Sequence, residues 1–250
     1  MLYNIFFSPT GGCKKVANII AHEINAKCID IDLLDEIDGK VLNSNDIAIF
    51  TLPSYGGRCP ATAIERMRRI TGNGSRAILV AVYGNRAIED TLIEMKDVVV
   101  GQAFHPIAAI EAIAEHSILH IYGQGRPDAD DINELEEFAR RIKDIKDLST
   151  VAVPGNFPYK SLPSSGIKPF TTDKCTSCGL CARECPAHAI DATNPALINK
   201  EMCISCMHCI SICPVKAKKL DEIKVKDIQR KLEPACKDRK ENKLYINEYC

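Results

Sequence analysis

The most informative residues in this sequence are two runs of cysteines. Each run has the spacing C-x2-C-x2-C-x3-C followed by Pro, and the second run starts at Cys203, 28 positions after the first starts at Cys175. Three cysteines at this spacing can wrap around three iron atoms of a [4Fe–4S] cluster, and the fourth cysteine of a run is carried away to the other cluster. The pattern therefore predicts two [4Fe–4S] clusters, each with ligands from both runs.

The predicted ligands form two sets of four. The first cysteine set is Cys175, Cys178, Cys181 and Cys213, and the second cysteine set is Cys203, Cys206, Cys209 and Cys185. Structural zinc is an alternative, because zinc sites also use four cysteines, but zinc does not explain a third CxxC interval followed by Cys-Pro. Disulfides are a second alternative, which a reducing compartment disfavours.

Composition narrows the class of protein. The 250 residues suggest about two domains, and the net charge of −1 gives no overall attraction to nucleic acid or anionic lipid. The N-terminus lacks the basic start of a signal peptide, and no stretch approaches the roughly 20 apolar residues of a membrane helix. We therefore expect a cytoplasmic protein without nucleic-acid or membrane partners. Five further cysteines show no ligand spacing: Cys13, Cys28, Cys59, Cys236 and Cys250.

Apolar runs alternate with helical patterns in the first part of the chain. We predict helices between the strands, a further helix at about 128–146, and strands at residues 2–7, 28–33, 46–52, 77–83 and about 103–113. This alternation is typical of an α/β fold with a doubly wound parallel sheet, in which ligands bind beyond the carboxyl ends of the strands.

Three loops rich in Gly, Tyr and hydroxyl residues follow predicted strands. The first loop precedes a helix, and the unpaired N–H groups at a helix start bind phosphate. Tyrosines in the other two loops are candidates to cover a planar ring. The residues predicted to bind a cofactor are Ser8, Thr10, Gly11, Gly12, Cys13 and Lys14 in the first loop, Pro53, Ser54, Tyr55, Gly56 and Gly57 in the second, and Tyr83, Gly84, Asn85 and Arg86 in the third.

The first loop, Ser8-Pro9-Thr10-Gly11-Gly12-Cys13, resembles the phosphate loop of flavodoxins, and the other two loops are similar to their flavin loops. With the cysteine runs, about residues 1–220 resemble the flavodoxin–ferredoxin fusion proteins, or iron–sulfur flavoproteins. The resemblance implies FMN bound by these loops, with Glu115-His116-Ser117 near the flavin. One position departs from the flavodoxin pattern, because Cys13 stands where flavodoxins usually have Thr, and a thiol is a weaker donor.

The expected organisation has four parts. These are a flavodoxin-like FMN-binding domain at 1–147, a Pro-, Gly- and Ser-rich linker at 148–166, a small α+β ferredoxin-like domain with two [4Fe–4S] clusters at 167–220, and a C-terminal tail or docking helix at 221–250. The linker is long enough for two copies to exchange cluster domains, which would make a homodimer. His188 and His208 flank cluster cysteines and are candidates for hydrogen bonds to sulfur.

We predict electron transfer between FMN, the two clusters and a redox protein partner, since no nicotinamide site is visible. No catalytic acid, base or nucleophile is predicted, because the cofactors carry the chemistry. Three alternatives remain open. One is a flavin-dependent reductase of a small molecule such as a quinone, oxygen or a nitro compound. The second is a binding or sensing module, in which the state of the clusters controls association with another protein. The third is a ferredoxin whose flavodoxin-like half binds a partner and no flavin.

Overall fold

The computed structural model describes residues 1–162 and 166–247, so part of the predicted linker and Cys250 lie outside the described residues. Within these ranges, no helix has the length and apolar composition needed to cross a bilayer. The elements in chain order are β1 (Leu2–Phe6), α1 (Gly12–Ile24), β2 (Cys28–Asp32), β3 (Lys40–Val41), β4 (Ile47–Pro53), α2 (Ala61–Met67), β5 (Ile70–Thr71), β6 (Arg76–Tyr83), α3 (Thr91–Gly101), β7 (His105–Ile113), α4 (Ala129–Lys143), β8 (Phe170–Thr171), α5 (Leu180–Arg183), α6 (His208–Ser211), β9 (Lys218–Lys219), α7 (Glu222–Cys236) and β10 (Lys243–Ile246).

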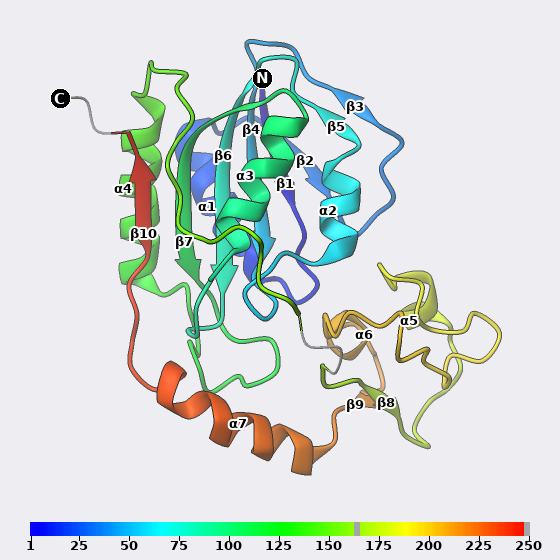
Figure 1. Ribbon diagram of the computed structural model, residues 1–250. Coiled ribbons are helices and arrows are strands. Elements are labelled where there is room, and N and C mark those ends of the chain that lie inside the picture. Colours follow the sequence, from blue (N-terminus) through cyan, green and yellow to red (C-terminus); the bar gives the residue numbers. More distant parts are fainter. Residues whose placement is uncertain (163–165, 248–250) are drawn as a thin grey trace.

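A six-stranded sheet with the order β10-β7-β6-β4-β1-β2 forms the centre of the first domain (Figure 1). Its five strands from the first part of the chain are parallel, whereas β10 is antiparallel to β7. Numbered along the chain, the five parallel strands have the order 2-1-3-4-5, which is the flavodoxin-like doubly wound order. The predicted fold class is confirmed. The short strands β3 and β5 pair with each other outside this sheet.

The sheet separates two apolar cores, because successive side chains of a strand point to opposite faces. One face packs against α2 and α3, and the other packs against α1 and α4. Strand β6 contributes to both cores, with Ala77, Leu79, Ala81 and Tyr83 on the first face and Ile78, Val80 and Val82 on the second. A strand buried on both faces needs the continuous apolar run that the sequence has there.

The described part of the predicted linker, residues 148–162, packs along the first domain. Val151 is buried in the core on the α3 side of the sheet. The buried carboxylate of Asp90 accepts hydrogen bonds from the backbone N–H groups of Asn156 at 2.9 Å and Lys160 at 2.6 Å. These N–H groups, that of Lys160 first, lower the pKa of Asp90, so a charged carboxylate holds the linker in place.

The C-terminal segment returns to the first domain after the cysteine runs. Helix α7 is followed by β10, which extends the sheet beside β7 (Figure 1). The sequence prediction for residues 221–250 included a docking helix but no strand. Four residues give too short a pattern to predict an edge strand, and the pairing partner is more than 100 positions away in the chain.

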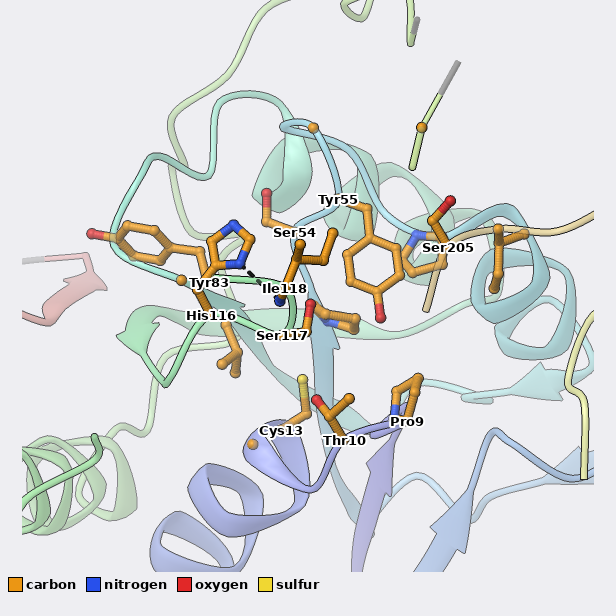
Figure 2. Close-up of a pocket in the computed structure, with 18 of the residues that line it drawn as sticks. Pro9, Thr10, Cys13, Ser54, Tyr55, Tyr83, His116, Ser117, Ile118 and Ser205 are labelled. Carbon is orange, nitrogen blue, oxygen red and sulfur yellow. Dashed lines mark hydrogen bonds between the residues drawn. The ribbon is translucent and has the colours of Figure 1, made fainter. Parts of the chain in front are cut away.

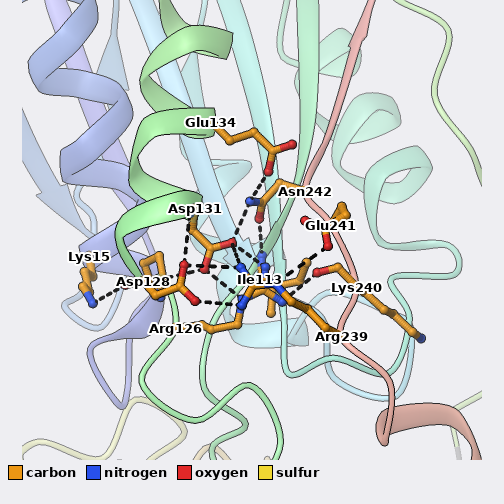
Figure 3. Close-up of polar contacts among 11 residues, drawn as sticks. Lys15, Ile113, Arg126, Asp128, Asp131, Glu134, Arg239, Lys240, Glu241 and Asn242 are labelled. Carbon is orange, nitrogen blue, oxygen red and sulfur yellow. Dashed lines mark hydrogen bonds and ion pairs between the residues drawn. The ribbon is translucent and has the colours of Figure 1, made fainter.

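A buried polar network anchors this segment (Figure 3). Arg126 donates to both carboxylate oxygens of Asp131, and its Nη1 donates to the carbonyl of Lys240 at 2.7 Å. Asn242 donates to Asp131 at 3.0 Å and accepts from the last N–H group of β7 at 2.9 Å. The charged pair is therefore satisfied by hydrogen bonds, which a buried pair requires.

Candidate functional site

A cavity of about 460 Å³, here called the loop cavity, lies beyond the carboxyl ends of β1, β4 and β6 (Figure 2). This is the edge at which ligands bind in doubly wound sheets. Ten of the fifteen residues predicted to bind a cofactor line it, namely Ser8, Thr10, Gly12, Cys13, Pro53, Ser54, Tyr55, Gly56, Tyr83 and Gly84. The remaining five do not line it, namely Gly11, Lys14, Gly57, Asn85 and Arg86.

The first loop forms the start of α1. Gly11 has a φ of 90°, a left-handed conformation that favours glycine, and the helix begins at Gly12. The hydroxyl oxygen of Ser8 accepts a hydrogen bond from the backbone N–H of Lys14 at 2.8 Å. The N–H groups at the first positions of a helix have no partner within the helix, so this end of α1 can bind an anion.

Cys13 is buried, and its thiol faces the loop cavity between the first loop and the other labelled residues (Figure 2). Burial raises the pKa of this thiol, so the group stays protonated near neutral pH. A protonated thiol is a weak hydrogen-bond donor and a poor nucleophile. An anion bound at this loop would therefore be held mainly by backbone N–H groups.

The two predicted ring-covering tyrosines differ in orientation. The ring of Tyr55 extends toward Ser117 and the first loop, whereas the side chain of Tyr83 points away from the other labelled residues (Figure 2). Burial, and then the nearby thiols of Cys206 and Cys13, raise the pKa of Tyr55. Burial also raises the pKa of Tyr83, to about 12. Tyr55 is therefore the tyrosine placed to contact a ligand in the cavity.

The third loop also holds the C-terminal segment. The Nδ2 of Asn85 donates to the backbone carbonyls of Cys236 at 2.6 Å and Asp238 at 2.8 Å. Arg86 forms an ion pair with Glu89 at 2.6 Å. Both side chains, which the sequence analysis assigned to cofactor binding, therefore contact protein groups outside the cavity.

The loop after β7 forms a further wall of the cavity, and it includes the predicted His116 and Ser117. The Nδ1 of His116 accepts hydrogen bonds from the backbone N–H groups of Ile118 and Leu119, both at 3.1 Å. Burial lowers the pKa of His116 to about 4, so the ring is neutral and can accept these bonds. Gly84 permits this packing, because a Cβ there would lie 2.5 Å from the Cβ of His116.

The eight cysteines of the two runs gather around two small cavities. One is lined by Cys175, Cys178, Cys181 and Cys213, and the other by Cys185, Cys203, Cys206 and Cys209. These two groups are the first and second cysteine sets that the sequence predicts. Within residues 1–162 and 166–247, all cysteines are free thiols, and no three His, Cys, Asp or Glu side chains converge on the position of a single metal ion.

Comparison with known proteins identifies the cysteine region. A family described as a 4Fe-4S dicluster domain matches residues 168–214. An uncharacterized polyferredoxin-like protein of Methanocaldococcus jannaschii is 43% identical over 58 residues, which are 23% of this chain and 25% of the relative. The chain therefore spans about a quarter of the length of this curated relative. A dicluster domain indicates electron transfer in general terms.

Several flavodoxin structures match the first part of the chain. The flavodoxin of Streptococcus pneumoniae TIGR4 is 19% identical, and the match covers 57% of this chain and 97% of that one with a TM-score of 0.42. Oxidised flavodoxin 1 of Bacillus cereus is 16% identical, with coverage of 58% and 99% and a TM-score of 0.43. The strand order of the sheet decides the fold. The chain joins a domain of flavodoxin-like fold to a region, residues 168–214, that matches the 4Fe-4S dicluster domain.

The dicluster domain contacts the flavodoxin-like domain at the first loop and beside α2. At the first loop, the carbonyl of Pro9 lies 2.7 Å from Nδ1 of His208 and accepts a hydrogen bond from the hydroxyl of Ser211 at 3.1 Å. At α2, the buried side chain of Arg66 donates to the carbonyl of Pro186 at 3.0 Å. These contacts join segments more than 100 positions apart in the chain. Nε2 of His188 also lies 3.5 Å from Oε1 of Glu36, so both histidines that were expected to bond sulfur contact the flavodoxin-like domain.

Part of the dicluster domain also lines the loop cavity. Ile204 and Ser205, which stand between Cys203 and Cys206 of the second cysteine set, form one wall together with Lys168. The hydroxyl oxygen of Ser205 is buried and has no hydrogen-bond partner among the described residues. An unpaired buried hydroxyl is costly, so its place in the cavity suits a polar group of a bound ligand.

Proposed function

We propose that this protein passes electrons between FMN in the loop cavity and two [4Fe–4S] clusters in the dicluster domain, and on to a redox protein partner. One observation carries the proposal. The segment between Cys203 and Cys206 lines the same cavity as the three loops expected to hold FMN. The two cofactor sites therefore share a wall.

The loop cavity fits FMN in size and chemistry. Its volume of about 460 Å³ lies within the range of about 300–1,000 Å³ that is usual for ligand pockets. The start of α1 would hold the phosphate, and Tyr55 would contact the ring. The unpaired hydroxyl of Ser205 would donate to a polar edge of the ring system or accept from it.

The two cysteine sets fit two cubane clusters. Burial raises the pKa of both Cys206 and Cys209 to about 12, so these thiols are costly to ionise without a metal. Metal binding supplies that compensation and couples it to folding. The backbone N–H groups of Ala189 and Ala217 donate to the sulfur atoms of Cys185 at 3.3 Å and Cys213 at 3.2 Å, as expected around cluster ligands.

When bound, FMN exchanges one or two electrons and each cluster exchanges one. The chain itself supplies position and shielding. The contacts of His208 and Ser211 with Pro9 hold the dicluster domain against the phosphate loop. Ile118, Leu162 and Ile228 line the loop cavity with apolar side chains, which limits the access of water.

The proposal is tested by anaerobic purification followed by measurement of iron, sulfide and FMN per chain. We expect about eight iron atoms and eight sulfides for two clusters, and about one FMN. An absorption spectrum before and after dithionite should show bleaching of both chromophores. Eight iron atoms with no FMN, even after FMN is added, would leave a dicluster protein whose flavodoxin-like domain serves as a scaffold.

A second candidate is a flavin-dependent reductase of a small molecule. The apolar side chains of Ile118, Leu162 and Ile228 favour it, because they provide a surface for a planar apolar substrate such as a quinone. Anaerobic mixing of the reduced protein with a quinone would distinguish a reductase from an electron carrier. Multiple turnovers without a protein partner support the reductase, and a single slow oxidation supports the carrier.

A further inference from the structure

The two cysteine runs form an internal repeat, and the repeat is broken at one buried position. Ile190 and Lys218 each stand five residues after the last cysteine of a run, so they are equivalent across the offset of 28. Ile190 lines the cavity of the second cysteine set, and Lys218 lines the cavity of the first. An uncharged side chain beside one site is therefore replaced by a cation beside the other.

Lys218 is a cation placed inside the dicluster domain. The residue is 2% exposed. Its ammonium group donates to the hydroxyl of Thr171 at 2.8 Å and to the carbonyl of Pro195, both of which are uncharged acceptors. No carboxylate among the described residues forms an ion pair with it. A buried charge without a counter-charge is strongly unfavourable, so the negative charge that balances Lys218 must come from the site beside it.

The four cysteines of the first set, which line one cavity together with Lys218, identify that negative charge. A [4Fe–4S] cluster with four thiolates carries a net negative charge in both redox states, and reduction by one electron makes it more negative.

We propose that Lys218 raises the reduction potential of the cluster held by the first cysteine set above that of the cluster held by the second. The step concerned adds one electron and no proton, with reduced FMN as the electron donor in the protein and dithionite in the test. A cation in a poorly solvated site stabilises the added negative charge. This inference rests on the proposed binding of both clusters.

The positions of the two cysteine sets determine in which direction the difference in reduction potential would drive an electron. The loop cavity is lined by residues next to ligands of the second set, and by none next to ligands of the first. Each set has one buried cysteine, Cys181 or Cys206, but only the first set has an exposed one, Cys178. The cluster with the higher potential would thus lie farther from the flavin and nearer the surface, where a redox protein partner can accept the electron.

The test is an anaerobic redox titration followed by electron paramagnetic resonance, on the full chain and four variants. Lys218→Met removes the buried charge, and Lys218→Gln removes it while keeping a donor for Thr171. Lys219→Met is the matched control, because Lys219 is the next residue and is exposed. Cys178→Ser changes a ligand of the first set alone and so identifies which midpoint potential belongs to that cluster.

In the Lys218 variants, we expect the reduced fraction of the first cluster to fall at fixed potential. The ratio of reduced to oxidised cluster should change at least about tenfold, which corresponds to about 59 mV for one electron. The second cluster should shift less, and Lys219→Met should shift neither. Equal shifts of both clusters, no shift, or the same shift in the control would overturn the proposal.

Iron and sulfide measurements on every sample separate this inference from the proposed function. A wild-type chain that does not assemble two clusters contradicts the proposed function. A wild-type chain with two clusters, whose first midpoint potential stays unchanged in both neutral variants, contradicts only the role of Lys218. Loss of the first cluster in both neutral variants would show that Lys218 acts in assembly and would also overturn its role in setting the potential.

Discussion

The two domains differ in what holds them together. The flavodoxin-like domain buries two large apolar cores on either face of its sheet. The hydrophobic cluster of the dicluster domain has only Cys181, Ala182 and Ile190 at its centre. A segment of this size cannot bury enough apolar surface to fold by packing alone. We infer that the first domain folds by apolar packing, whereas the dicluster domain would fold around the proposed clusters.

Removal of iron should produce the largest difference in stability between the two domains. Structural metal sites contribute on the order of 10 kcal/mol to folding, so we expect anaerobic chelation of iron to unfold the dicluster domain. The sheet of the flavodoxin-like domain should remain folded. Hydrogen exchange followed by mass spectrometry would show loss of protection in residues 166–220 and retained protection in β4 and β6. Equal protection of both domains after iron removal would contradict the comparison.

A substitution in the apolar core should destabilise the flavodoxin-like domain and leave the dicluster domain unchanged. Leu79 is fully buried in β6, and Leu79→Ala should lower the free energy of unfolding of the flavodoxin-like domain by about 2–5 kcal/mol. Thermal unfolding followed by far-ultraviolet circular dichroism measures this loss. Val41→Ala, at a position that is 70% exposed, is the control and should have little effect. The iron content of the purified Leu79→Ala chain should stay that of the wild type.

Substitution of Cys13 tests whether the first domain holds its cofactor by preformed hydrogen bonds. Cys13→Thr replaces a weak thiol donor with a hydroxyl at the phosphate loop. We expect the FMN dissociation constant to fall by about 2- to 10-fold, the value of one hydrogen bond of about 0.5–1.5 kcal/mol. Fluorescence titration of FMN measures it. Cys13→Val has the same shape as Thr without the hydroxyl, so equal affinity of the two variants would contradict this role.

The smallest expected effect concerns pH and the C-terminal segment. The Arg239 guanidinium, 2.7 Å from Asp128, lowers the pKa of that carboxyl. Burial acts to raise the pKa of Asp131, but hydrogen bonds from Arg126 and other groups lower it overall. A carboxyl with a lowered pKa in the folded state stabilises above its unfolded pKa of about 3.9, and this stabilisation is lost as pH falls toward the folded value.

We therefore expect residues 237–247 to lose hydrogen-exchange protection below about pH 4, before β4 and β6 do. Asp128→Asn is the matched control, because it keeps a side chain of the same shape without the titrating group. Its protection should depend less on pH than that of the wild type. An identical pH profile in the two proteins would show that Asp128 does not stabilise the docking of this segment.

Local patterns in the sequence predicted much of the molecule. The cysteine spacing predicted the groups that line the two small cavities, because each run is short and its geometry is local. The strand and loop patterns predicted the sheet and ten of the residues that line the loop cavity. Asn85 and Arg86 follow a predicted strand in the same way, but their side chains turn to the C-terminal segment and to Glu89.

Contacts between distant segments could not be predicted in this way. Strand β10 is four residues long, and its place in the sheet depends on Asn242 and the buried pair of Arg126 and Asp131. The contact of Arg66 with Pro186 joins an ordinary helix position to the segment between the two cysteine runs. Ser205 lines the loop cavity together with three loops that are more than 100 positions away in the chain, so no single segment carries a signal for it.

The central claim, that the two domains share one electron path, is tested most directly by flash photoreduction of FMN in the anaerobic full-length protein. The absorbance of the clusters is followed after the flash at several protein concentrations. The shared cavity wall predicts that the clusters are reduced at a rate independent of protein concentration. A rate proportional to concentration, or no reduction of the clusters, would contradict transfer within one chain.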